Sequence, residues 1–170
     1  MEQTFIRLAT AEDAPVIANI VNTAWKTAYS GIVPQSYLDS LDEIPREQRL
    51  VEGLERFSDL RYYLFEENGV PVGAASLHPT HDEDLADTSE FTFFYFLPSV
   101  WRRGYGRMLL ERLKADSRTL GFRQICCWVL EENTRAIAFY ESQGMLRDGK
   151  RQVVTIGEPL EAVRCVGKLE

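Results

Sequence analysis

The sequence predicts a mixed α/β (α+β) domain in which helices flank one central sheet. Segments with strand and helix patterns alternate in the order β-α-α-β-β-β-α-β-α-β-β, about seven strands and four helices. An Asn-Gly pair separates two strand-like runs, and a later apolar strand passes directly into a helical pattern. Since 170 residues suit one core and no linker or repeat interrupts them, we expect a single domain spanning residues 1–170.

The chain is predicted to begin with one strand and two helices. Residues 4–9 alternate apolar and polar side chains, as a half-buried strand does. Thr10 is expected to cap the first helix. The buried stripe of that helix consists of apolar side chains at helical spacing: Ile17, Ile20, Val21, Ala24, Trp25 and Ala28. Residues 30–37 (SGIVPQSY) are expected to end this helix, and Pro45 to begin the next.

The middle of the chain contains the strongest turn signal. Residues 61–67 (RYYLFEE) and 70–78 (VPVGAASLH) flank Asn68-Gly69, which predicts a hairpin. An acidic loop, residues 79–90, follows the hairpin. The apolar strand then leads into a helix that Gly121 is expected to end.

The C-terminal part is predicted to contain three strands and one short helix. Residues 123–130 (RQICCWVL) form an apolar strand, and Asn133 caps a helix that runs to Gly144. Residues 152–156 and 161–169 are expected to pair as two strands. The three cysteines, an odd number without framework spacing, predict buried free thiols and a reducing cytoplasm: Cys126, Cys127 and Cys165.

Charge and hydropathy limit the classes of function that the chain can have. No apolar run approaches the length of a membrane span, and the N-terminus does not resemble a signal peptide, so we expect a cytoplasmic location. The net charge of −7 argues against general nucleic-acid binding. Residues 1–97 hold 17 acids and 6 bases, whereas residues 98–170 hold 9 acids and 13 bases. This asymmetry arises from solvated helix faces or from one half meeting a cation and the other an anion.

A glycine-arginine turn at the start of the helix after Pro98 predicts an anion site. A helix N-terminus presents free N–H groups, glycines let a ligand approach the backbone, and arginines add positive charge. The turn reads WRRGYGR over residues 101–107, so we expect a phosphate or pyrophosphate there. Two common phosphate motifs fail, since the Walker Gly-Lys-Ser/Thr is absent and Leu109 stands where a dinucleotide fingerprint needs a small residue. A tight turn with solvated arginines is the alternative.

Two segments resemble the GNAT superfamily of N-acetyltransferases. Residues 97–113 (LPSVWRRGYGRMLLERL) are similar to its acyl-CoA-binding signature, in which Gln/Arg-x-x-Gly-x-Gly/Ala begins a helix, with Trp101 in place of Gln/Arg. Residues 129–145 (VLEENTRAIAFYESQGM) resemble its later strand and Asn-x-x-Ala-x-x-Phe-Tyr helix, with Met145 in place of the usual Phe. The opening FIRLATAEDAPVI is also similar to family N-termini.

The resemblance implies a fold and a cosubstrate. It implies a mostly antiparallel sheet, splayed between strands four and five, with pantetheine in the gap and no metal. The cosubstrate would be acetyl-CoA, and the N–H of Phe94 would donate to its thioester oxygen. Asn133 would lie near the pantetheine arm, or act only as a helix cap. The residues implied to bind coenzyme A are Phe94, Phe96, Leu97, Trp101, Arg102, Arg103, Gly104, Tyr105, Gly106, Arg107 and Asn133.

The implied function is an N-acetyltransferase that transfers acetyl to a primary amine of a small molecule (polyamine, aminoglycoside or amino-acid-like) or a peptide N-terminus by direct attack. A non-catalytic acyl-CoA-binding or regulatory domain of the same fold is the alternative. Tyr140 matches the family's general acid, although spacing alone makes it a packed aromatic. Glu90 is the candidate base or a solvated strand-end acid, with His78 and His81 as alternative bases.

The acceptor pocket is expected in the N-terminal half, where AWKTAYSGIVPQSYL resembles a segment of small-amine members. Its candidate walls are Trp25, Tyr29 and Ile32, of which Trp25 also suits the helix core. The acids of the loop are expected either to attract a cationic amine or to be solvated: Asp82, Glu83, Asp84 and Asp87. A homodimer is possible.

Overall fold

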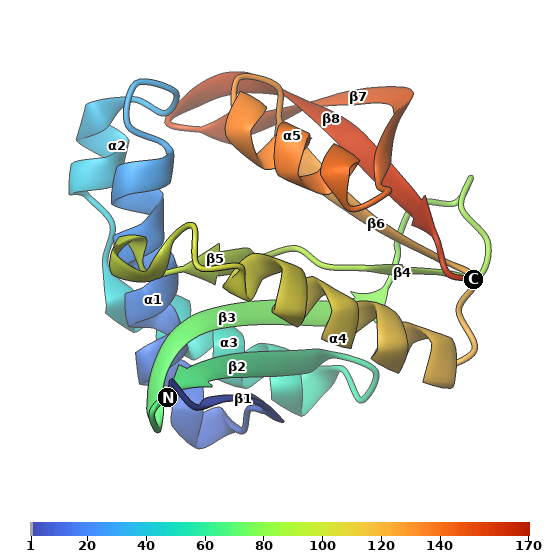
Figure 1. The fold of residues 1–170 in the computed structure, drawn as a ribbon. Helices are drawn as coiled ribbons and strands as arrows, with labels where there is room; N and C mark the ends of the chain where they lie inside the picture. The colour runs from blue at the N-terminus through green and yellow to red at the C-terminus, as the bar shows by residue number, and fades with distance from the viewer. Residues whose placement is uncertain (1) are drawn as a thin grey trace.

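The computed structural model describes residues 2–170 and shows an eight-stranded sheet with helices on both faces (Figure 1). Two 3₁₀ turns, Ala11–Asp13 and Pro98–Val100, accompany the longer elements. The α-helices are α1 Ala14–Ala28, α2 Gln35–Asp39, α3 Glu43–Arg56, α4 Tyr105–Thr119 and α5 Thr134–Ser142. The strands are β1 Thr4–Leu8, β2 Arg61–Glu67, β3 Val70–Pro79, β4 Thr88–Glu90, β5 Phe94–Phe96, β6 Gln124–Leu130, β7 Leu146–Ile156 and β8 Glu158–Lys168.

The sheet runs in the order β1-β2-β3-β4-β6-β8-β7, and β5 continues the line of β4 by pairing with β3. Every pair is antiparallel except β4 with β6. The mixed, mostly antiparallel fold predicted from the sequence is therefore confirmed. The strand count rises from seven to eight because the predicted fourth strand is divided into β4 and β5.

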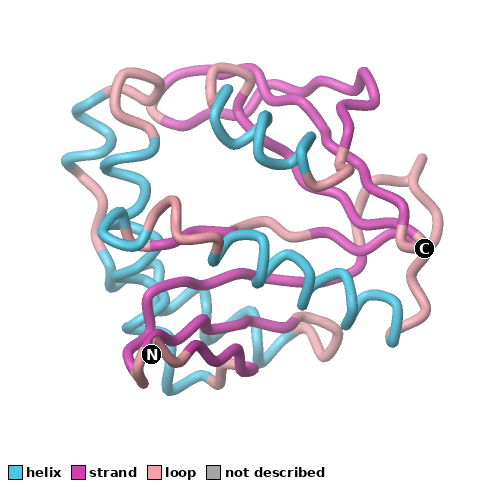
Figure 2. Tube along the Cα trace, in the orientation of Figure 1, coloured by secondary structure: helices cyan, strands magenta, loops and turns pink. Residues whose placement is uncertain are grey.

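The division between β4 and β5 is a one-residue bulge. Glu90 lies opposite His78, and Phe94 lies opposite Ala75, so four steps along one strand match three along the other. The hydroxyl of Ser76 accepts hydrogen bonds from the N–H groups of both residues 92 and 93, at 2.9 and 3.2 Å. Beyond this bulge β5 follows β3 and no longer pairs with β6, so the two strands diverge, as Figure 2 shows.

Local signals account for most element boundaries. The hairpin between β2 and β3 turns at Asn68 and Gly69, which have φ values of 52° and 80°. The N–H of Thr10 donates a hydrogen bond to the carboxylate of Asp13 at 2.8 Å, as in a capping box. Asp42 caps α3, so that helix begins two residues before Pro45, which lies in its first turn.

Two expectations about the connections need correction. The run 30–37 was expected only to break the first helix, but Pro34 is the N-cap of the five-residue helix α2. The final strands also begin earlier than predicted, at residues 146 and 158, because the β7 ladder continues across a register shift between Arg147 and Arg151.

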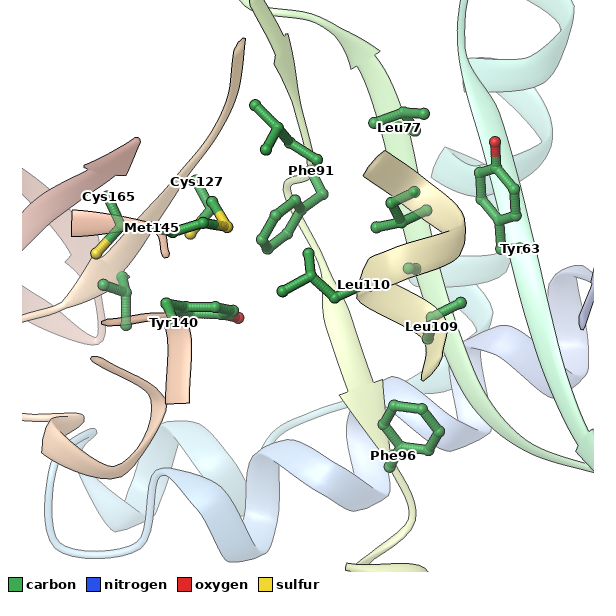
Figure 3. Packing of buried hydrophobic residues seen from close by; sticks show 14 of the residues in the cluster. Tyr63, Leu77, Phe91, Phe96, Leu109, Leu110, Cys127, Tyr140, Met145 and Cys165 are labelled. Carbon is green, nitrogen blue, oxygen red and sulfur yellow. The ribbon is translucent and has the colours of Figure 1, made fainter. Parts of the chain in front are cut away.

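Two hydrophobic layers hold the sheet. Helices α4 and α5 cover one face, where Leu109, Leu110 and Met145 are fully buried (Figure 3). Helices α1 and α3 cover the other face of the N-terminal strands, where Ile17 and Leu64 are fully buried. The three cysteines are buried and free, as expected from the sequence. None of the helices within residues 2–170 combines the length and apolar character that a membrane crossing requires.

The ring of Phe96 lies directly on Gly73, its neighbour across the β3–β5 ladder. A Cβ atom at residue 73 would overlap that ring, so β5 needs glycine there to lie at its present position. We predict that Gly73→Ala lowers the free energy of unfolding by about 1–3 kcal/mol, measured by urea denaturation.

The exposed residue Val70 on the same strand provides the control. Val70→Ala should change the free energy of unfolding by less than about 0.5 kcal/mol, because the Val70 side chain is largely exposed to solvent. An equal effect of the two substitutions would contradict the proposed contact between Gly73 and Phe96.

Candidate functional site

A cavity of about 570 Å³ lies where β5 and β6 diverge. It is lined from α1 and the residues after it, from β5, from the turn that begins α4, from the end of β6 and from α5. Thus segments from both halves of the chain meet at the opening in the sheet. The lining includes most of the residues that the sequence singled out: Tyr29, Ile32, Phe94, Phe96, Trp101, Arg102, Gly104, Gly106, Arg107, Asn133 and Tyr140.

The turn before α4 has the shape that its glycines predict. Gly104, the N-cap of α4, has a φ of 82°, a conformation that side chains disfavour. A Cβ atom on Gly106 would lie 3.3 Å from the ring of Phe139, so this glycine permits the close approach of α4 and α5. Gly104 and Gly106 both line the cavity, so these two residues place no side chain between it and the backbone at the start of α4.

The arginines of the turn divide into two groups. Arg102 and Arg107 line the cavity, and neither has a carboxylate within 4.0 Å among residues 2–170. Arg103 instead donates to Glu67, outside the cavity lining. Tyr105 also lies outside the lining, where its ring stacks on Phe65 and its hydroxyl donates to Glu67. Only the backbone of these two residues remains available for the predicted coenzyme A contact.

Arg135 is a cavity residue that the sequence reasoning missed. Its guanidinium lies 4.0 Å from the ring centre of Trp101, and both residues line the cavity. Burial lowers the pKa of Arg135, and the positive charge of Arg102 lowers it further. The sequence signal that could have identified Arg135 is its position two residues after Asn133, which caps the helix. The cavity therefore carries three arginines, none of them paired with an acid in the described chain.

The backbone of β5 presents free groups to the cavity. The carbonyl of residue 93 accepts from Ser76 N–H, and the N–H of Leu97 donates to Val72, so these residues bond toward β3. Hydrogen-bonding direction alternates along a strand, which directs the backbone groups of Phe94 and Phe96 to the other side, toward the gap. The carbonyl of Phe96 accepts from the indole of Trp101 at 2.9 Å. Leu97 itself lies outside the cavity lining.

Tyr140 lies on α5 beside Phe91 (Figure 3), with the ring centres 5.6 Å apart, and the residue is 8% exposed. Its hydroxyl has no hydrogen-bond partner in the part of the chain that the structure describes, and the residue lines the cavity. Burial raises the pKa of Tyr140 well above its ordinary value. The phenol is therefore neutral at physiological pH and free to donate a proton into the cavity.

Asn133 both caps α5 and lines the cavity. Its side-chain oxygen accepts the N–H of Ala136 at 3.3 Å. Because the cap uses only the side-chain oxygen, the amide nitrogen of Asn133 takes no part in it.

Glu90 lies apart from the cavity lining. It is 8% exposed, and its carboxylate accepts a hydrogen bond from Thr80 at 2.7 Å. His78 lies opposite it on β3 and stacks on His81, with ring centres 5.5 Å apart. The structure therefore brings the three candidate bases together. Glu90 directly precedes Phe91, whose ring packs on Tyr140, so the Glu90 side chain points to the opposite face of the sheet from Tyr140.

The other end of the cavity is aromatic. Tyr29 and Ile32 line it as expected, together with Tyr95 and Trp128. The hydroxyls of Tyr29 and Tyr95 lie 2.7 Å apart, and burial raises the pKa of both phenols. Trp25 packs edge-on against both tyrosines but does not itself line the cavity. Tyr95 was missed because the alternation of β5 directs its side chain away from the neighbouring phenylalanines.

Two of the four loop acids are paired with an arginine. Arg164 on β8 is 3% exposed and forms ion pairs with Asp82, Asp84 and Asp148. Asp82 also accepts from the indole of Trp128 at 3.0 Å. Asp82 and Asp84 therefore fold the loop onto the sheet, and Asp82 also holds Trp128. For these two acids the ion pairs replace both alternatives expected from the sequence, attraction of a cationic amine and simple solvation.

Comparison with known proteins agrees with the architecture. The Acetyltransferase (GNAT) family matches residues 21–145. The chain is 30% identical over 141 residues to the uncharacterized N-acetyltransferase YuaI of Bacillus subtilis, an alignment that covers 81% of this chain and 77% of the relative.

Solved structures share the fold over nearly the whole chain. The PaiA N-acetyltransferase of Thermoplasma acidophilum, solved with coenzyme A, has a TM-score of 0.76 and 19% identity, with 98% of this chain and 99% of that chain covered. YncA of Salmonella typhimurium, a putative acetyltransferase solved with acetyl-CoA, has a TM-score of 0.73 and 23% identity, with 99% and 95% covered. From its family match, the YuaI alignment and this shared fold, the chain belongs to the GNAT family of acetyltransferases.

Proposed function

We propose that this acetyltransferase transfers acetyl from acetyl-CoA to a primary amine of a small molecule or a peptide N-terminus by direct attack. The observation that carries the proposal is the cavity through the opening in the sheet. Unpaired arginines lie along it at the turn before α4, and the free hydroxyl of Tyr140 also lines it. A non-catalytic acyl-CoA-binding domain, the alternative, has no need of a buried donor without a partner.

The arginine side of the cavity suits coenzyme A. The pyrophosphate would meet the N–H groups at the start of α4, with Arg102, Arg107 and Arg135 supplying charge. The pantetheine arm would lie in the gap, bonded to the backbone groups of Phe94 and to the N–H of Phe96, whose carbonyl already accepts from Trp101. The structures of two relatives that hold coenzyme A or acetyl-CoA support this choice of cosubstrate.

The chemistry assigned to the centre of the cavity uses two donors. The amine attacks the thioester carbon, and the N–H of Phe94 would stabilise the oxyanion that forms. The carbon–sulfur bond then breaks, and Tyr140 would give its proton to the departing thiolate of coenzyme A. Its raised pKa keeps the phenol protonated at physiological pH, and the proton that the attacking nitrogen releases would restore the phenol after the transfer.

The attacking amine must first lose a proton. Glu90 remains our candidate base, and because it lies outside the cavity lining it would act through water or through its neighbour Thr80. His78 and His81 adjoin the same group and are the other candidates.

A turnover assay separates enzyme from binder. We expect thiol release from acetyl-CoA that depends on an added amine, tested over polyamines, aminoglycosides, amino acids and peptides. Coenzyme A binding without release with every amine class would favour the non-catalytic alternative.

The two adjacent arginines of the turn allow a matched test of the coenzyme A position. Arg102 lines the cavity, whereas Arg103 is held by Glu67. Arg102→Gln should weaken coenzyme A binding about 10-fold or more in calorimetry, since a charge-assisted bond to phosphate is lost. Arg103→Gln should leave the affinity within about twofold of wild type, and a larger loss in Arg103→Gln than in Arg102→Gln would refute the proposed orientation.

The role of Tyr140 is tested by removing its hydroxyl. Tyr140→Phe keeps the ring, and the lost hydroxyl had no partner, so the melting temperature should stay near that of wild type. The kcat should fall roughly 100-fold or more if thiolate departure limits the rate. Because burial raises the Tyr140 pKa, the acid form is lost only above its ordinary range, so wild-type kcat should show no alkaline decline up to about pH 9.

Tyr63 provides the reverse control. Its hydroxyl donates to Asp116 at 2.8 Å, and the residue does not line the cavity. Tyr63→Phe should cost about 0.5–1.5 kcal/mol of unfolding free energy while kcat is retained. A kcat of Tyr140→Phe within about twofold of wild type would make Tyr140 a packing residue.

A further inference from the structure

Two buried side-chain donors lack a hydrogen-bond partner within residues 2–170: Nδ2 of Asn22 and Nε1 of Trp25. They lie three residues apart on α1, so they occupy one side of the helix. Asn22 is 2% exposed. The indole N–H of Trp25 lies beside the hydroxyl of Tyr95 without forming a well-aligned hydrogen bond, and Nδ2 of Asn22 has no partner within residues 2–170. Because buried polar groups normally find partners, these two donors indicate that a good acceptor is missing beside this side of α1.

A third donor group, the guanidinium of Arg46, contacts both of these residues. Arg46 on α3 donates from Nε to Oδ1 of Asn22 at 2.6 Å, and its guanidinium carbon lies 5.3 Å from the ring centre of Trp25. Since a guanidinium has no acceptor, the amide oxygen of Asn22 must face Arg46. That bond fixes the amide and directs Nδ2 elsewhere.

Arg46 carries an uncompensated charge. No carboxylate of the described residues lies within 4.0 Å of it, and burial, followed by repulsion from Arg49, lowers its pKa. Glu43, one turn earlier on α3, accepts instead from Asn19 at 2.9 Å. The cluster of Asn22, Trp25 and Arg46 therefore offers donors and positive charge and lacks an acceptor for its orphaned N–H groups.

This donor cluster adjoins the aromatic end of the cavity. The ring centre of Trp25 lies 4.9 Å from that of Tyr29 and 6.3 Å from that of Tyr95, and both tyrosines line the cavity. The orphaned N–H groups are closed off from solvent in this conformation. A ligand in the cavity would reach them by moving the edge of Trp25 away from the tyrosines.

We propose that the donor cluster binds a carboxylate of the acceptor, so that the acceptor is an amine that also carries a carboxylate. This inference rests on the proposed function and narrows its acceptor class. A carboxylate brings only acceptors and matches a guanidinium. A polyamine would bring further donors and a positive charge toward Arg46, which leaves every orphaned group unsatisfied.

Matched acceptors test the specificity. Glycine, β-alanine and 4-aminobutanoate are each compared with their amides, which keep the length and amine but lose the negative charge. We expect kcat/KM for at least one acid to exceed that of its amide about 10-fold or more. Arg46→Gln should remove this difference. Arg49→Gln, an exposed arginine on the same helix, should retain it.

A second readout does not depend on turnover. The chain has three tryptophans, so its indole N–H groups give three NMR signals, and Trp25→Phe identifies the signal of residue 25. Sodium acetate and 4-aminobutanoate should shift that signal saturably in wild type and Arg49→Gln but not in Arg46→Gln. Sodium chloride at equal ionic strength should leave it unchanged.

The outcomes separate the two proposals. A carboxylate-dependent shift of Trp25 without acetylation of any amine would support the anion site and refute the proposed function. Acetylation in which amides equal acids at every length, with a Trp25 signal that ignores carboxylates, would refute the anion site and leave the proposed function standing.

Discussion

The cavity depends on one extra residue in the strand that follows the acidic loop. Ser76 holds the bulge by accepting two consecutive backbone N–H groups, and without it the ladder from β4 would continue alongside β6. Because the register shifts there, β5 stays with β3 while β6 continues with β8. The opening in the sheet, the free backbone of Phe94 and the meeting of α1 with α5 all follow from that single shift.

Sequence patterns predicted the elements whose signals are local. Asn68-Gly69 specified the hairpin through its positive φ angles, and Gly104 specified the tight turn at the start of α4. The bulge could not be predicted, because the hydroxyl that stabilises it belongs to Ser76, in another strand. The run 30–37 concealed α2 because Gly31 and Pro34 indicate a break and the helix is too short to show periodicity.

The orientation of charged side chains required the tertiary structure. The sequence shows Arg102 and Arg103 as equivalent, and only the position of Glu67 on β2 decides which one faces the cavity. Likewise Asp82 belonged to an acidic loop in sequence but is paired with Arg164 in the fold. An unpaired buried donor costs about 1–3 kcal/mol, so the fold tolerates few of them. Those that remain, at Asn22 and Trp25, are unusual enough to carry information.

The strand β4 is only three residues long, yet within residues 2–170 it is the only strand that joins the two halves of the sheet. Its ladders to β3 and β6 span two and three residue pairs, beside the long ladders within each half. Few backbone hydrogen bonds therefore hold the two halves together. Side-chain packing carries most of the junction, because one buried cluster contains Leu77 of β3 and Cys127 of β6. A substitution that loosens this cluster would thus alter the width of the gap as well as the stability of the fold.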